Sequence, residues 1–170
     1  MVYWLEESLM ARAFLDQRAK FHSDLLLHEL SIASEVRYTG AIDRSLEERR
    51  QQLLADAREG SIDIAHVRTG YNFSLYINGH HSPHFPANKG NKDSPQGSSS
   101  SSSSELEGDS VRISTSSGRM HIVSHFVLNG VNIVWRGWID TNSLEGMACI
   151  EFDEMRALLQ ERDIVQKDQG

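Results

Sequence analysis

The sequence predicts an α+β fold built as one domain. Two helical patterns come first, a series of strand patterns follows, and one more helix comes last, so helices and strands are segregated along the chain. The turns between the strand patterns are short. The chain has 170 residues and is 39% hydrophobic, which supplies enough apolar surface for one core and fits one domain better than two.

Charge and composition exclude several classes of protein. The formal net charge is -7, and an acidic surface repels phosphate, so direct binding of nucleic acid is disfavoured. Cys149 is the single cysteine, which excludes an intramolecular disulfide framework and a zinc site with several cysteines. The apolar runs fall far short of the ~20 residues of a membrane helix, and residues 1–7 do not resemble a secretory signal. We expect a soluble protein of a reducing compartment.

Two helices are expected in the first third of the chain. Apolar residues recur at helical spacing over residues 16–36, and the segment 38–40 ends this pattern. A second helix begins at Ser45, where Glu48 stands three positions on, as in a capping box. Gly60 suits the C-terminal end of this second helix.

Alternating apolar and polar residues predict strands after the second helix. These strands are expected at residues 62–67, 71–77, 111–115, 120–125, 131–139 and 147–152. Asn129-Gly130 is the strongest hairpin signal in the chain, because both residues tolerate positive φ. Asp153 can cap a final helix that runs to about Val165.

One internal segment, residues 79–110, departs from globular composition. It is rich in polar residues, contains a run of serines from Ser98 to Ser104, and has little apolar surface with which to offset the entropy of ordering. We interpret it as a disordered insertion in a single domain of residues 12–170. Residues 1–11 form an N-terminal extension, in which packing back on the domain competes with contact to a partner.

The histidines and the cysteine give no strong sign of a metal site or a nucleophile. His80, His81 and His84 could bind zinc or copper weakly, but a disordered tract offers no further contacts to orient such ligands. His121 and His125 are four residues apart on one strand face, which separates them by ~13 Å and prevents joint chelation. Cys149 lies in an apolar strand pattern and is expected to be a small buried residue.

A group of acids near the C-terminal end could in principle support hydrolysis. Capping and helix-dipole roles explain them more simply, because no base or nucleophile accompanies them. The five acids are Asp140, Glu145, Glu151, Asp153 and Glu154. Trp135 and Trp138 should face opposite sides of a regular strand unless Gly137 makes a bulge, and core packing is the default expectation for both.

These motifs, taken in order, resemble the core-binding factor beta subunit family. The matching stretches are Val36-Arg37-Tyr38-Thr39-Gly40, Thr69-Gly70, VLNGVNIVWRGWID at residues 127–140, Leu144-Glu145-Gly146-Met147 and Glu151-Phe152-Asp153-Glu154. The resemblance covers residues 16–77 and 119–157. It implies helices packed on a curved, partly open antiparallel β-barrel.

The resemblance also implies a function. Members are the non-DNA-binding subunit of a heterodimeric transcription factor, and they allosterically raise the DNA affinity of the Runt-domain alpha subunit. The chain is then not an enzyme, and it needs no cofactor, metal, membrane or small-molecule substrate. DNA is met only indirectly through the partner. The expected location is the nucleus, with a cytoplasmic stage before import with the partner.

The partner-binding residues follow from the resemblance position by position. They are Gly70, Asn72, Tyr76, Phe126, Leu128, Asn129 and Arg12. An asparagine at a hairpin tip can both donate and accept hydrogen bonds, and a glycine lets another backbone come close. The chain departs from the family, which usually has Gln at Tyr76, Met at Phe126 and Pro at His125.

Two other functions remain open from the residues alone. The serine run could be a phosphorylated tail through which a generic protein-interaction adaptor is regulated. The C-terminal acids could belong to a small carboxylate-dependent enzyme.

Overall fold

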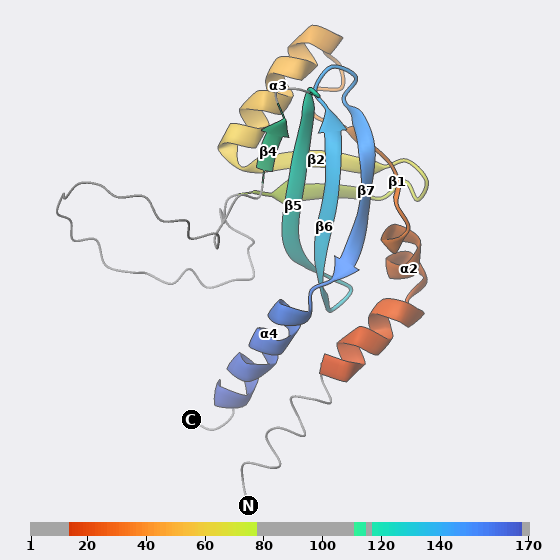
Figure 1. The fold of residues 1–170 in the computed structure, drawn as a ribbon, viewed down its shortest axis with the longest axis vertical. Helices are drawn as coiled ribbons and strands as arrows, with labels where there is room; N and C mark the ends of the chain where they lie inside the picture. The colour runs from red at the N-terminus through yellow and green to blue at the C-terminus, as the bar shows by residue number, and fades with distance from the viewer. Residues whose placement is uncertain (1–13, 78–110, 115–116, 168–170) are drawn as a thin grey trace, which may run out of the picture.

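The computed structural model describes residues 14–77, 111–114 and 117–167, which form four helices and seven strands (Figure 1). In chain order these are a helix at residues 14–23, α2 (Leu25–Ser31), β1 (Ser34–Tyr38), α3 (Leu46–Glu59), β2 (Ser61–His66), β3 (Asn72–Tyr76), β4 (Val111–Ser114), β5 (Arg119–Leu128), β6 (Val131–Asp140), β7 (Glu145–Phe152) and α4 (Glu154–Lys167). The expected extension at residues 1–11 and insertion at 79–110 lie outside the described residues.

The strands form one antiparallel sheet that bends round toward closure. Its order is β3-β2-β1-β7-β6-β5-β4, and β2 runs across behind β5, β6 and β7 in Figure 1. β3 and β5 are not neighbours in this order, yet the Ser124 hydroxyl on β5 donates to the Tyr76 carbonyl on β3 at 2.9 Å. The predicted α+β fold, with a curved and partly open antiparallel barrel, is therefore confirmed.

The core lies inside this curve. Trp135 is fully buried, and a side chain at Gly137 would place its Cβ 2.6 Å from the indole, so the glycine makes room for the ring. On the opposite side of the core, Ile62 and Ile64 of β2 and Leu53 of α3 are completely buried. The helix of residues 14–23 and α4 project from one end of the sheet, and α3 covers the other end (Figure 1).

The prediction of one helix over residues 16–36 is wrong in its second part. Asp24 interrupts the helix, because its carboxylate accepts hydrogen bonds from the backbone of Leu26 and Leu27 and so starts α2 anew. α2 ends at Ser31, and residues 34–38 form β1. β1 pairs with both β2 and β7, and those two ladders decide its conformation.

The local signals are confirmed. Ser45 and Glu48 form a complete capping box, and Gly60 closes α3 with φ 93°. Asn129 and Gly130 have φ 51° and 76° at the β5–β6 hairpin. Asp153 accepts from the Arg156 backbone N–H and so caps α4.

Two side chains expected in the core lie on the outer face of the sheet instead. β6 keeps a regular register with β5 and β7 through Gly137, so the strand alternates normally. Of the two tryptophans on β6, Trp135 points inward and Trp138 points outward. Trp138 is half-buried, and the Arg119 guanidinium lies over its ring at 4.0 Å from the centroid. Cys149 is likewise half-buried on that face. No helix within the described residues is long and apolar enough to span a membrane.

Candidate partner interface

The place where β3 approaches β5 forms a seam in the barrel, which we call the β3–β5 seam. Two contacts define it: the hydrogen bond from Ser124 to Tyr76, and a contact between the Phe73 and Phe126 rings at 5.3 Å. Because the residue numbers rise on β3 as they fall on β5, the two strands run in opposite directions. The turn before β3, which carries Gly70, therefore lies toward the same end of the seam as the β5–β6 hairpin.

β3 presents polar side chains outward along this seam. Its residues alternate strictly, with Phe73 and Leu75 buried and Asn72 and Tyr76 exposed. Tyr76 leaves 40% of its surface exposed, although its backbone carbonyl is engaged by Ser124. The two outward residues that the resemblance implicates thus share one face of an edge strand.

Gly70 leaves an open surface beside β3. Its φ is 68°, a left-handed conformation, and nothing lies within 4 Å of the position that a Cβ would take. Its N–H donates to the His66 carbonyl at 2.8 Å, which closes the turn. The positive φ favours glycine here, whereas no neighbouring atom of this chain would exclude a side chain. The space above Gly70 is open to the backbone of another molecule.

Asn129 at the hairpin tip is held by a contact with a distant helix. Its side-chain amide donates to Asp24 at 3.2 Å, and the other oxygen of Asp24 accepts from the Leu26 and Leu27 backbone at the start of α2. The hydrogen bond from the Leu27 N–H, aided by that from Asn129, lowers the pKa of Asp24. Asn129 is exposed, and its amide retains further donor and acceptor capacity in a fixed orientation.

The remaining expected residues are placed differently. Phe126 is half-buried and packs against the core through Phe73. Leu128 is only 8% exposed and belongs to the core itself, so it supports the hairpin more than it offers surface. Arg12 lies outside the described residues.

A buried histidine lies beneath the seam, which the sequence did not predict as a functional group. The indole N–H of Trp135 donates to His66 Nε2 at 2.9 Å, so Nε2 carries no proton and Nδ1 holds the hydrogen, within 3.3 Å of the Ser34 hydroxyl. Burial lowers the pKa of His66 to about 4. The neutral ring contacts Phe73 edge-on at 5.6 Å, so this network supports the inner side of β3.

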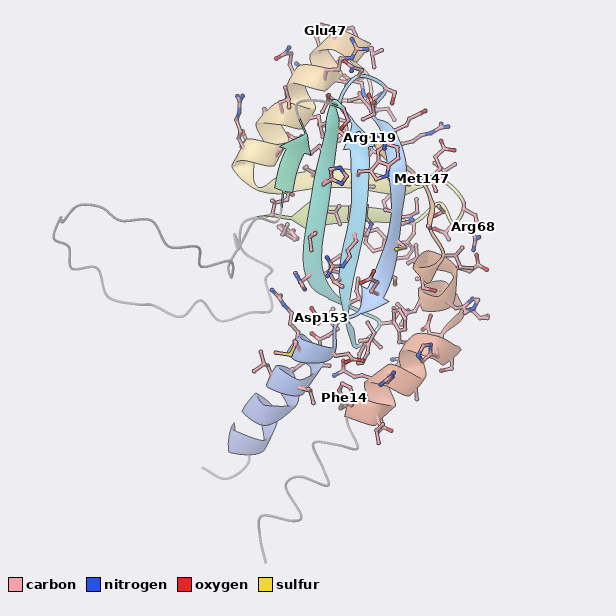
Figure 2. The ribbon with its side chains drawn as sticks, viewed as in Figure 1. Phe14, Glu47, Arg68, Arg119, Met147 and Asp153 are labelled. Carbon is pink, nitrogen blue, oxygen red and sulfur yellow. The ribbon has the colours of Figure 1, made fainter. Side chains whose placement is uncertain are left out.

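A second unpredicted pair joins β5 to α4. His125 Nδ1 lies 2.5 Å from a carboxylate oxygen of Asp153, whose other oxygen caps α4 (Figure 2 labels Asp153 at this junction). Burial raises the pKa of Asp153, but the hydrogen bonds from His125 and from the Arg156 backbone outweigh it and leave that pKa below its ordinary value. Asp153 therefore anchors the strand that carries Phe126.

The C-terminal acids do not converge on a common site. Asp140 accepts hydrogen bonds from the backbone of the turn that follows it. Glu145 pairs with Arg37 at 3.3 Å, and Glu151 pairs with Arg136 at 3.0 Å. Each acid has a structural partner, which fits the capping and ion-pair roles rather than hydrolysis.

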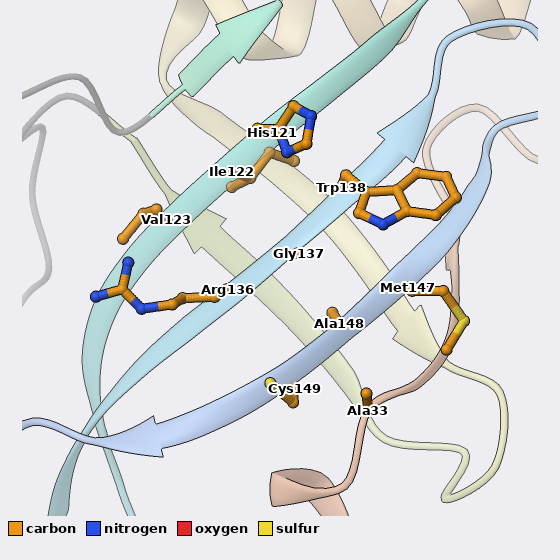
Figure 3. Close-up of a pocket in the computed structure, with 10 residues that line it drawn as sticks. All are labelled: Ala33, His121, Ile122, Val123, Arg136, Gly137, Trp138, Met147, Ala148 and Cys149. Atoms are coloured by element: carbon orange, nitrogen blue, oxygen red, sulfur yellow. The ribbon is translucent and has the colours of Figure 1, made fainter. Parts of the chain in front are cut away.

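The outer face of β5, β6 and β7 carries a shallow pocket of about 380 Å³ (Figure 3). Trp138, Met147 and Cys149 line it, together with His121, Val123 and Arg136. Burial, followed by the charge of Glu151, raises the pKa of the Cys149 thiol, so the group is a poor nucleophile at neutral pH. His80, His81 and His84 lie outside the described residues, and within those residues no three metal-ligating side chains gather.

Comparison with known proteins identifies relatives that match nearly the whole chain. The profile of the family described as core binding factor beta subunit matches residues 10–169. The chain is 38% identical over 161 residues to Protein brother of Drosophila melanogaster, which covers 95% of this chain and 66% of that protein. It is 36% identical over 160 residues to Protein big brother of the same organism, covering 94% and 64% respectively. The chain spans about two thirds of the length of these relatives.

Proposed function

The chain belongs to the core binding factor beta subunit family, and from this premise we propose that it pairs with a Runt-domain transcription factor as its non-DNA-binding regulatory subunit. The family consists of transcription cofactor subunits without enzymatic activity. The proposed partner is the Runt-domain alpha subunit, and the proposed site of pairing is the β3–β5 seam. The pairing takes place in the nucleus, or in the cytoplasm before joint import.

The observation that carries the proposal is the gathering of expected interface residues along one open seam. Asn72, Tyr76 and Asn129 are exposed there, although they come from segments far apart in the chain. Gly70 adds an uncrowded turn at the same end. The exposed Tyr76 is an aromatic side chain of the kind that interface hot spots use, and the polar Asn72 lies on the same face of β3.

The proposed mechanism is a shift in the conformational equilibrium of the partner. A subunit that binds the DNA-competent form of the Runt domain better than the other forms raises the population of that form and so its apparent DNA affinity. Linkage requires that DNA strengthen the heterodimer by the same factor. The net charge of -7 fits this division of labour, because an acidic chain can promote DNA binding only when it docks away from the phosphates.

A mobility-shift titration tests the proposal directly. A Runt domain and labelled DNA are mixed with increasing amounts of the full chain, and we expect a slower ternary complex and a lower dissociation constant for DNA. In the reciprocal titration, saturating DNA should tighten the protein–protein affinity by the same factor. A chain that leaves both the mobility and the DNA affinity unchanged would contradict the proposal.

A further inference from the structure

Asp24 lies where the helix of residues 14–23 meets α2, and all of its polar groups are hydrogen-bonded. Its N–H donates to the Lys20 carbonyl at 2.9 Å and so completes the last turn of the first helix. Its own carbonyl accepts from the His28 N–H at 2.9 Å and begins α2. One carboxylate oxygen caps α2, and the other accepts from the Asn129 amide at 3.2 Å. Asp24 therefore links the β5–β6 hairpin to two helices that lie at the same end of the sheet (Figure 1).

The core holds Asp24 in place from both sides. Phe21, in the last turn of the first helix, is buried, and its ring lies 6.0 Å from that of Phe152. Leu27 and Leu30 of α2 are completely buried. Because both helices are anchored in this way, the carboxylate of Asp24 keeps a fixed position relative to the sheet. It is therefore a firm acceptor beside a hairpin tip that is itself exposed.

A second side chain of the first helix reaches the same tip. The Lys20 Nζ lies 3.5 Å from the position that a Cβ would take on Gly130, the residue that follows Asn129. The hydrogen bond from the Leu27 N–H lowers the pKa of Asp24 most, and the charge of Lys20 lowers it further. Asp24 is therefore ionised at neutral pH, and an ionised carboxylate can only accept hydrogen bonds.

This carboxylate decides which way the Asn129 amide faces. The NH₂ group of Asn129 must turn toward Asp24, because the amide oxygen in that place would set two acceptors against each other. In a planar amide the oxygen then turns away from the carboxylate. Because Asn129 is exposed, an N–H group of another molecule can reach that oxygen.

We propose that Asp24 is a positioning residue of the partner interface, which fixes the Asn129 amide so that its oxygen faces an N–H donor of the partner. The inference rests on the proposed pairing with a Runt domain. It adds to that site a residue outside the barrel, which acts through Asn129 and not by touching the partner. An amide that is already fixed binds more tightly than a freely rotating one, because less side-chain freedom is lost on association.

A double-mutant cycle on the full chain separates this role from a structural one. Asp24→Asn keeps an oxygen to cap α2 but turns an NH₂ group toward Asn129, whose amide must then reverse. We expect calorimetry with a Runt domain to show about tenfold weaker binding, as for the loss of one hydrogen bond. In the Asn129→Ala background the same change should have no further effect. Equal weakening in both backgrounds, or no weakening in either, would overturn the proposal. Asp16→Asn, the same acid-to-amide change at an exposed position of the first helix, is the control and should bind as the wild type does.

Nuclear magnetic resonance relaxation of the free chain tests the fixed amide without a partner. The side-chain NH₂ of Asn129 should be nearly as rigid as the backbone in the wild type and mobile in Asp24→Asn, with the exposed Asn142 amide as the internal control. A chain that binds the Runt domain although its Asn129 NH₂ is as mobile as that of Asn142 would overturn this proposal alone. A chain with a rigid Asn129 amide that binds no Runt domain would instead contradict the proposed function.

Discussion

Strands that lie side by side in the barrel are joined in two different ways, and the difference separates stability from recognition. Along the β5–β6 contact the backbone ladder is continuous from Arg119 to Leu128 on β5, and β7 pairs with β6 in the same way. We call these three strands, β5, β6 and β7, the wall. At the β3–β5 seam, a side-chain hydrogen bond from Ser124 and a contact between two rings take the place of a ladder. A full ladder satisfies its own backbone groups, whereas a seam leaves groups that another molecule can meet.

The two regions therefore differ in how much of their surface is already covered. The wall buries Trp135 in the core, while the outward residues of β3 stay in solvent until something covers them. Exposed strand edges invite pairing with other chains and are usually blunted or covered. A partner at the seam would serve both needs at once. The predictions below test whether stability and binding divide along this line.

The largest effect is expected on the inner face of the wall. Trp135→Ala should lower the free energy of unfolding by about 4 kcal/mol, because it opens a large cavity and leaves His66 without its hydrogen-bond donor. Chemical denaturation measures this loss. Trp138→Ala is the matched control on the outer face of the same strand, and it should cost much less. Equal losses would show that the two faces of β6 are not distinct.

The next effect is a pH dependence from the histidine beneath the seam. The pKa of His66 is lowered to about 4 by burial, against about 6.5 in the unfolded chain, so between these values the unfolded state binds more protons. Stability should therefore be complete above pH 6.5 and fall as the pH drops toward 4, by about 3 kcal/mol.

Denaturation at several pH values measures this slope. The variant His66→Gln should be less stable at neutral pH but should lose most of the slope between pH 4 and 6.5. His121→Gln, on the outer face of β5, is the control and should keep the wild-type slope. A wild-type slope that survives in His66→Gln would assign the effect to other groups.

Much of the fold could be predicted from local sequence because the deciding residues are close together. The capping box of Ser45 and Glu48 and the turn at Asn129-Gly130 are set by residues within a few positions of one another. β1 could not be separated from the helix before it, because Val36 fits both a helical stripe and a two-residue alternation over so short a segment. Its pairing with β2 and β7 is non-local and leaves no mark in the local pattern.

The candidate site shows the same division. The resemblance to a family supplied its residues, and composition or spacing alone would not have done so. The link from Ser124 to Tyr76 spans 48 positions and that from Asn129 to Asp24 spans 105. The expectation that Trp138 packs in the core is wrong because β6 has no bulge at Gly137, and regular alternation then turns Trp138 outward when Trp135 points inward.

At the seam, the expected effect is on binding rather than on folding. Asn129→Ala should weaken the heterodimer by about 2 kcal/mol if the hairpin tip is a hot spot, and calorimetry with a Runt domain measures this change. The free energy of unfolding should fall by only about 1 kcal/mol, the order of strain expected from alanine at positive φ. Asn142→Ala, an exposed asparagine in the β6–β7 turn, is the control and should bind as the wild type does. Unchanged affinity in Asn129→Ala would remove this residue from the interface.

The smallest effect tests how the seam is held. Ser124→Ala removes the hydroxyl that donates to the Tyr76 carbonyl, which should cost about 1 kcal/mol of stability. Hydrogen exchange should rise in β3 and stay unchanged where β5 pairs with β6, because the loss concerns the seam and not the ladder. Ser74→Ala, which loses only an exposed hydrogen bond to Asp63, is the control and should leave β3 protected. If exchange instead rises equally in β3 and β6, the seam and the wall unfold as one unit, and the barrel is closed more completely than its hydrogen bonds indicate.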